Sequence, residues 1–168
     1  MSEGQAGEGR RAAGRAALNP VLRPAHAAEV PAVRALLEAA GLPLEGLDKV
    51  ASLWVATVGG QVAGAVAFER HGNLGLLRSL VVAPQHRGAG LGKRLLVRCV
   101  RSMQGAGVTD AYALTTTIAP WLAREGWARR ERAGLPRALS ASPELQGACP
   151  ASAEAFHLPL GTGPSPKR

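Results

Sequence analysis

The chain has 168 residues and a net charge of +8, and its 46% hydrophobic content includes few aromatic residues. That length suits one domain with a sizeable core. The charge is compatible with nucleic acid or small polyanions as partners, but the absence of a recognisable binding motif argues against nucleic acid. No apolar run reaches the roughly 18 residues of a membrane span, and no signal peptide is evident, so we expect a cytoplasmic protein that binds no membrane.

The chain divides into a central region and two ends of different composition. Residues 1–17 are rich in Gly, Ala, Arg and Glu without periodicity, which predicts a disordered arm. Residues 161–168 resemble a flexible tail. We therefore expect a single folded domain over residues 18–160.

The first predicted elements are a weak strand and a helix. Residues 18–23 favour an edge strand, although Pro20 interrupts them and moves its start toward Val21. Residues 24–40 carry apolar side chains at helical spacing, and Gly41 can close that helix.

Two β-rich runs, 53–58 and 61–69, flank the Gly59-Gly60 pair, which indicates a tight hairpin. Residues 76–83 are apolar on both faces and predict a central strand. The later expected elements, in order, are a helix after Pro84 that ends near Gly105, a strand at 108–115, a short helix at 120–125, a strand at 127–130, a long loop or irregular helix at 131–152, and a seventh strand at 155–160.

A glycine-rich segment, residues 85–92, lies between the central strand and the following helix. Glycines at 88, 90 and 92 let the backbone approach a ligand closely, and the helix start adds a partial positive charge. Arg87, Lys93 and Arg94 contribute full charges, so the segment is suited to a phosphate or pyrophosphate. Its spacing matches neither a Walker loop nor a dinucleotide-binding fingerprint.

The run from Pro84 to Gly92 resembles motif A of the GNAT superfamily, the general amine N-acetyltransferases. The resemblance implies an α/β fold with a mixed, twisted sheet of six or seven strands and about four helices. Residues 76–80, 114–117 and 149–153 further resemble small GNAT proteins of arsenic-resistance operons. Yet Cys99 and Cys149 are the only thiols, and no CxxC motif or Cys/His ligand cluster accompanies them, so we expect no metal site. Arsenic coordination is not expected either, because there is no third thiol.

The resemblance implies that acetyl-CoA lies where the fourth and fifth strands separate, with its pantetheine arm acting as an additional strand. The residues expected to bind it are Leu80, Val81, Val82, Gln85, His86, Arg87, Gly88, Ala89, Gly90, Leu91, Gly92, Lys93, Thr115 and Thr116.

Acetyl transfer requires a neutral amine, and therefore a group or a water chain that removes the ammonium proton. Glu69, at the end of the third strand, is the candidate base; the alternative is a solvated glutamate at a strand end. Many relatives use a tyrosine on the short helix as the general acid, but Leu122 occupies that place, and Tyr112, the only tyrosine, is on a strand.

Arg78 interrupts an apolar strand, and a buried guanidinium requires a partner. We expect Arg78, with Ser79 beside it, to bind a substrate carboxylate, with an ion pair to Glu69 as the alternative. Arg132 and Arg137 either close over the same substrate or are surface charges.

Together these features predict an acetyl-CoA-dependent N-acetyltransferase. Its expected acceptor is the amine of a small, carboxylate-bearing molecule such as an amino-acid analogue, with a link to arsenic or toxic amino-acid resistance. The alternative is a non-catalytic, acyl-CoA-binding regulatory module. A homodimer is compatible with the sequence.

Overall fold

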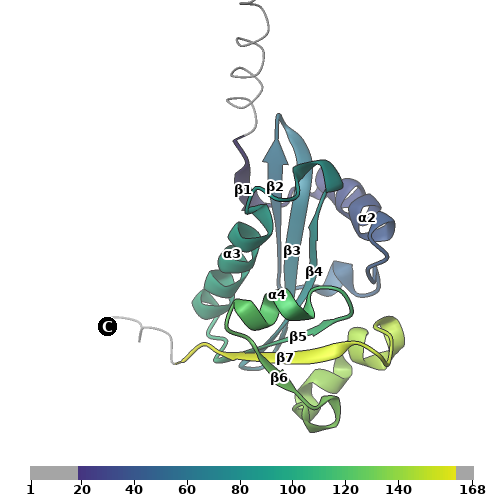
Figure 1. The fold of residues 1–168 in the computed structure, drawn as a ribbon, viewed down its shortest axis with the longest axis vertical. Helices are drawn as coiled ribbons and strands as arrows, with labels where there is room; N and C mark the ends of the chain where they lie inside the picture. The colour runs from purple at the N-terminus through teal and green to yellow at the C-terminus, as the bar shows by residue number, and fades with distance from the viewer. Residues whose placement is uncertain (1–18, 162–168) are drawn as a thin grey trace, which may run out of the picture.

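The computed structural model describes residues 19–161, which form a seven-stranded mixed sheet in the order β1-β2-β3-β4-β5-β7-β6 (Figure 1). The predicted arm at 1–17 and most of the predicted tail lie outside these residues. All neighbouring strands are antiparallel except β4 and β5. The strands are β1 (Val21–Pro24), β2 (Ser52–Val58), β3 (Gln61–His71), β4 (Leu74–Val82), β5 (Asp110–Thr115), β6 (Ala128–Arg130) and β7 (Glu154–Pro159).

Three α-helices accompany the sheet within the described residues: α2 (Val30–Ala39), α3 (Leu91–Gly105) and α4 (Ala119–Arg124). The prediction that the first helix begins at residue 24 is wrong. Pro24 pairs with Trp54 in the sheet, the Ala25 amide donates to the Leu53 carbonyl, and a short 3-10 turn at Ala27–Glu29 precedes α2. Sheet pairing thus extends the strand into a segment whose apolar spacing also fits a helix.

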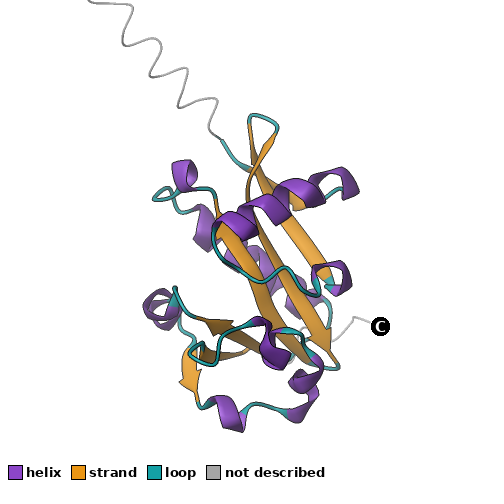
Figure 2. Cartoon of the chain, turned by 90° about the vertical axis from the view of Figure 1, so that its right-hand side faces the viewer, coloured by secondary structure: helices purple, strands orange, loops and turns teal. Residues whose placement is uncertain are grey.

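The two faces of the sheet are covered by different helices, and Figure 2 shows helices on both sides of the long strands. One core cluster joins α3 and α4 to β-strand side chains such as Val66 and Phe68. A second, smaller cluster joins Val33 and Leu37 of α2 to Ala65 of β3. Among the described residues, no helix is both long enough and apolar enough to cross a membrane.

A β-bulge in β4 marks the place where the sheet opens. Ala65 pairs with Val81 and Ala67 pairs with Arg78, so Ser79 and Leu80 together face a single residue of β3. Ser79 has a φ of 58°, a left-handed conformation that a serine rarely adopts. Pairing between β4 and β5 spans only residues 74–77 of β4. Beyond them the two strands separate.

The region predicted as a loop or irregular helix, 131–152, consists mainly of short helical turns. They are η4 (Arg132–Gly134), η5 (Arg137–Ala141) and η6 (Glu144–Ala148). Ser142 is fully buried, and its Oγ accepts a hydrogen bond from the Glu144 amide. Internal hydrogen bonds of this kind hold Glu144 in a fixed place.

Gly64 of β3 allows α3 to pack close to the sheet. A Cβ atom at this position would lie 2.9 Å from the Val81 carbonyl oxygen and 3.0 Å from Leu95 Cδ1. We expect Gly64→Ala to lower the free energy of unfolding by about 1–3 kcal/mol in urea denaturation, because a backbone oxygen cannot easily move aside. Gly105→Ala in α3 is the control, since a Cβ there meets nothing within 4 Å. Equal losses in the two variants would contradict this account.

Candidate functional site

The separation of β4 from β5 contributes to a cleft of about 720 Å³. The C-terminal end of α2 forms one side of it, the open part of β4 forms the floor, and the start of α4 lies opposite. The lining residues are Ala39, Ala40, Leu42, Leu80, Val81, Val82, Pro84, Arg87, Gly92, Thr117, Ile118 and Trp121. Five of the residues predicted to bind acetyl-CoA therefore line one cleft: Leu80, Val81, Val82, Arg87 and Gly92.

The glycine-rich segment forms the turn that enters α3. Gly88 and Gly90 have φ values of 86° and 78°, and a Cβ atom on either would meet nothing within 4 Å. No side chain caps the start of α3, so its first amide groups remain free to bind a ligand. The loop therefore combines an open surface with the positive end of a helix, as an anion site requires.

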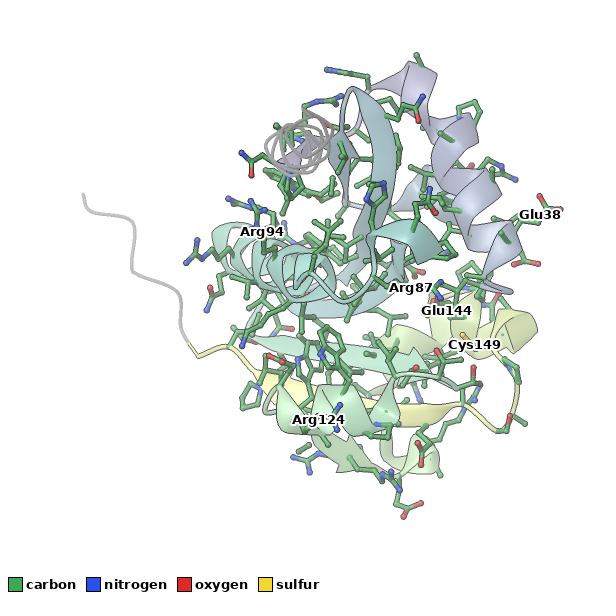
Figure 3. The ribbon with its side chains drawn as sticks, turned by 45° about the horizontal axis from the view of Figure 1, so that its top comes forward. Glu38, Arg87, Arg94, Arg124, Glu144 and Cys149 are labelled. Carbon is green, nitrogen blue, oxygen red and sulfur yellow. The ribbon has the colours of Figure 1, made fainter. Side chains whose placement is uncertain are left out.

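Cationic side chains surround the same loop. Arg87 is exposed, and its Nε donates to the Val82 carbonyl oxygen at 3.0 Å. Lys93 is also exposed, 3.5 Å from a carboxylate oxygen of Glu125. Arg94 is exposed, and in Figure 3 its label lies along α3 on the side away from Arg87. Arg87 is thus the cation placed at both the loop and the cleft.

A smaller chamber of about 180 Å³ adjoins the cleft. Four residues line both spaces: Leu42, Leu80, Thr117 and Ile118. The chamber also brings together four predicted site residues, Arg78, Ser79, Thr115 and Thr116. The chamber is therefore a side space that adjoins the cleft at these four shared residues.

Arg78 and Glu69 form a buried ion pair, with 2.9 Å between Arg78 Nη1 and Glu69 Oε2. The remaining guanidinium nitrogens face the Ser79 hydroxyl at 3.2 Å and the Pro43 carbonyl at 3.4 Å. Glu69 Oε1 lies 3.0 Å from His71 Nε2. The ion pair considered as the alternative for Arg78 is therefore present.

The interpretation of Glu69 as a solvated glutamate is wrong, because only 5% of the residue is exposed. Its position nevertheless does not favour catalysis. Both oxygens have partners, and Glu69 is not among the residues that line the cleft or the chamber. Leu76 is directly opposite Glu69 on β4. Arg78, which is opposite Ala67, reaches Glu69 diagonally across the two strands.

Arg132 and Arg137 do not line the chamber. The Arg132 Nη1 atom donates to the Pro150 carbonyl oxygen at 2.7 Å, while Arg137 is exposed at the start of η5. Both line a different hollow of about 490 Å³, next to Leu135. In this conformation they do not reach the same space as Arg78.

Glu144 is a chamber residue that the sequence reasoning missed. Only 3% of it is exposed, its Oε1 lies 3.8 Å from Arg78 Nε, and its Oε2 has no hydrogen-bond partner. Burial raises the pKa of Glu144 to about 7; Arg78 opposes this shift and the nearby Glu69 adds to it. The signal in the sequence was weak, because one glutamate in a polar, Pro-containing loop ordinarily predicts a solvated side chain.

Cys149 lies beside Glu144 in the chamber wall, as Figure 3 shows. Burial, followed by the negative charge of Glu144, raises the pKa of the Cys149 thiol to about 12. The thiol is therefore protonated at neutral pH, and a nucleophilic role is disfavoured. Leu122, in the place of the usual tyrosine, is fully buried against the same chamber, whereas Tyr112 stacks on His157.

Comparison with known proteins agrees with this geometry. Residues 49–129 match the family described as acetyltransferase (GNAT) domain. This match covers slightly less than half of the chain, so it shows a similarity to that family in sequence. The mixed seven-stranded sheet with its helices is the GNAT fold.

A more specific similarity is to amino-acid acetyltransferases. The chain is 28% identical over 125 residues to the amino-acid acetyltransferase of Neisseria meningitidis serogroup A, which covers 68% of this chain. The matched region is only 29% of that relative's length.

Solved structures show the same fold. N-acetylglutamate synthase from Neisseria gonorrhoeae, complexed with coenzyme A and N-acetyl-glutamate, superposes with a TM-score of 0.72 and 23% identity over 84% of this chain and 35% of that one. Rv2747 from Mycobacterium tuberculosis, in complex with CoA, gives 0.69 and 20% over 83% of this chain and 98% of that one.

Proposed function

We propose that the protein transfers an acetyl group from acetyl-CoA to the amine of a small acceptor. The observation that carries this proposal is the arrangement of the two spaces. An open strand edge and a glycine-rich helix start border one cleft, and the cleft adjoins an enclosed chamber with charged walls. A long donor and a small acceptor could therefore meet end to end, which is the geometry that direct transfer requires.

The residues of the cleft fit acetyl-CoA by chemical type. Amide groups of Gly88 to Gly92 and the guanidinium of Arg87 would bind the pyrophosphate. The unpaired backbone of Leu80 to Val82 would hydrogen-bond the amides of the pantetheine arm. For this to happen, Arg87 would have to release the Val82 carbonyl that it contacts in this structure. The thioester would then lie near Leu80 and Ile118, where the cleft adjoins the chamber.

We further propose an amino-acid-like acceptor. Support comes from the similarity to an amino-acid acetyltransferase and to an N-acetylglutamate synthase. Arg78 was the predicted carboxylate ligand, and its Nη2, which has only the long contact to Pro43, would be the donor available for that role. The arsenic link rests on sequence resemblance alone, so an amine panel should contain an arsenic-bearing amino-acid analogue next to ordinary amino acids.

The cofactor part of this proposal can be tested with Gly88→Glu. A carboxylate in the loop would repel the pyrophosphate, so we expect acetyl-CoA affinity to fall at least tenfold in isothermal titration calorimetry. Gly59→Glu is the matched control: it too places a glutamate at a positive-φ glycine with open space around it, but in the β2–β3 hairpin. Absence of acetyl-CoA binding in the unmodified protein, or equal affinities in the three proteins, would overturn the assignment.

A non-catalytic acyl-CoA-binding module is the second candidate. It is favoured by the buried Leu122 at the position of the usual general acid and by the full engagement of Glu69 in hydrogen bonds. A thiol-release assay against the amine panel separates the two candidates. Tight acetyl-CoA binding without turnover of any amine would favour the regulatory module.

A further inference from the structure

We propose that Glu144 binds the ammonium group of the acceptor in the chamber and accepts its proton before acetyl transfer. This inference rests on the proposed function. It replaces Glu69 as the base and assigns a role to a residue whose position in the sequence gave no sign of one.

The charges around the chamber are not balanced. Arg78 is the cation between two buried carboxylates, and it is paired closely with only one of them. Its Nη1 is 2.9 Å from Glu69, whereas its Nε is 3.8 Å from Glu144, which is outside hydrogen-bond distance. Glu69 has both Arg78 and His71 as close partners, whereas Glu144 has no partner within hydrogen-bond distance among the described salt bridges. A protonated amine in the chamber would give Glu144 a close cation.

The hydrogen bonds of Glu144 are also incomplete. Its Oε2 atom is buried and has no partner, a costly state for a polar atom. Since Glu144 lines the chamber, a small ligand that enters there can reach this carboxylate. An ammonium group has three N–H donors. It would donate a hydrogen bond to Oε2 of Glu144, and its positive charge would stabilise the ionised carboxylate.

Glu144 is held firmly enough to act on a bound molecule. Its amide donates to the Ser142 hydroxyl, and its carbonyl accepts from the Cys149 amide. Pro143, the preceding residue, packs so close to Gly46 that a Cβ atom on that glycine would lie 2.9 Å from Pro143 Cγ. The backbone that carries the carboxylate is therefore fixed before a ligand arrives, which favours proton transfer.

The groups that face Glu144 leave it able to exchange a proton near neutral pH. Burial favours its neutral form most strongly, Arg78 from β4 favours the charged form, Glu69 from β3 favours the neutral form, and the neighbouring Cys149 thiol favours the charged form as a donor, so its pKa lies at about 7. Cys149 is the remaining titratable neighbour in the chamber wall, and its own raised pKa keeps it neutral. A base with a pKa near the working pH is the most effective one.

The transfer would move two protons away from the amine nitrogen. Glu144 first takes one proton from the ammonium, which leaves a neutral amine and a neutral carboxyl group. The amine nitrogen then forms a bond to the thioester carbonyl carbon, and the carbon–sulfur bond breaks to release the coenzyme thiolate. The second proton lost from nitrogen passes to that thiolate through water. Finally Glu144 gives its proton to solvent, so the net products are the acetamide, free coenzyme A and one proton.

Glu144→Gln tests the catalytic part. The amide keeps the size of the side chain but cannot accept the proton, so we expect kcat/KM at neutral pH to fall about 100-fold or more. The rise of kcat/KM with pH, which we expect near pH 7 in the unmodified enzyme, should disappear, while acetyl-CoA affinity should stay within twofold. Glu154→Gln, a partly exposed glutamate paired with Arg129, is the matched control and should retain both activity and pH profile. Activity within threefold together with an unchanged pH profile in Glu144→Gln would overturn the proposal.

A measurement that does not depend on turnover separates this inference from the proposed function. We expect methylammonium, a probe small enough for the chamber, to lower the titration midpoint of Glu144 in ¹³C NMR of glutamate-labelled protein. The Glu144→Gln spectrum identifies the signal. Should the protein bind methylammonium in this way but acetylate no amine, the enzymatic proposal fails and the ammonium site stands; an unmoved midpoint refutes the site itself.

Folding of the variant can be checked separately. Because the folded-state pKa of Glu144 is raised, its charged form is disfavoured above the unfolded-state pKa, and the penalty is complete above about pH 7. The melting temperature of Glu144→Gln at pH 8 should therefore be no lower than that of the unmodified protein. A lower value would show that Glu144 has a structural role, which contradicts the account above.

Discussion

Arg78→Met should lower the free energy of unfolding by about 3–5 kcal/mol, because it removes one partner of a buried ion pair. The guanidinium is fully buried and is paired with Glu69. Methionine fills a similar volume but leaves the Glu69 carboxylate in a low-dielectric environment without its cation. Glu144 loses the positive charge of Arg78, 3.8 Å away, at the same time. Urea denaturation at pH 8 measures the loss.

The double variant Arg78→Met with Glu69→Gln is the control for this prediction. It also removes the unpaired, buried charge of the Glu69 carboxylate, so the double variant should be more stable than Arg78→Met alone. A surface arginine provides a second comparison: Arg129→Met breaks an exposed pair with Glu154 and should cost at most about 1 kcal/mol. Similar losses for Arg78→Met and Arg129→Met would mean that the buried pair is not what stabilises this part of the sheet.

Leu37→Ala should lower the free energy of unfolding by about 2–5 kcal/mol. Leu37 is fully buried in the small core between α2 and the sheet, together with Val33 and Val55. Its carbonyl also accepts a hydrogen bond from the Leu42 amide at 2.9 Å, and Leu42 lines both the cleft and the chamber. We therefore expect weaker acetyl-CoA binding as well, because the position of this wall of the cleft depends on how α2 packs against the sheet.

Leu36→Ala is the matched control, since Leu36 is the preceding residue on the same helix and is only half-buried. Its loss of stability should be clearly smaller, and its effect on acetyl-CoA affinity slight. Both quantities follow from denaturation curves and calorimetry on the same preparations. If Leu36→Ala destabilised the protein as much as Leu37→Ala, the assigned packing of α2 would be incorrect.

Features that depend on a few neighbouring residues were predictable from the sequence. The Gly59-Gly60 hairpin is one of them, because both turn positions require a positive φ and the flanking residues favour strands. The glycine-rich entry to α3 is another, and so is the central strand, whose apolar side chains on both faces imply cover on both sides. Together with the resemblance of residues 84–92 to motif A, these signals predicted the fold class.

Other features depended on packing between distant segments. Pro24 and Ala25 join the edge of the sheet although they lie in the segment predicted as a helix, because β2 offers free hydrogen-bonding groups there. The bulge at Ser79 arises from the register between β3 and β4, and no local preference of serine predicts it.

The sequence by itself determined that a glycine-rich turn bordered by basic residues leads from the central strand into a helix, because turn, helix start and positive charges are all local. Only the tertiary structure decided which charged groups surround Arg78. Glu69, Arg78 and Glu144 come from β3, β4 and the late helical turns, and their ionisation depends on burial and on distances between elements. Coulomb energies change steeply with those distances and with the local dielectric, neither of which can be read from residue order.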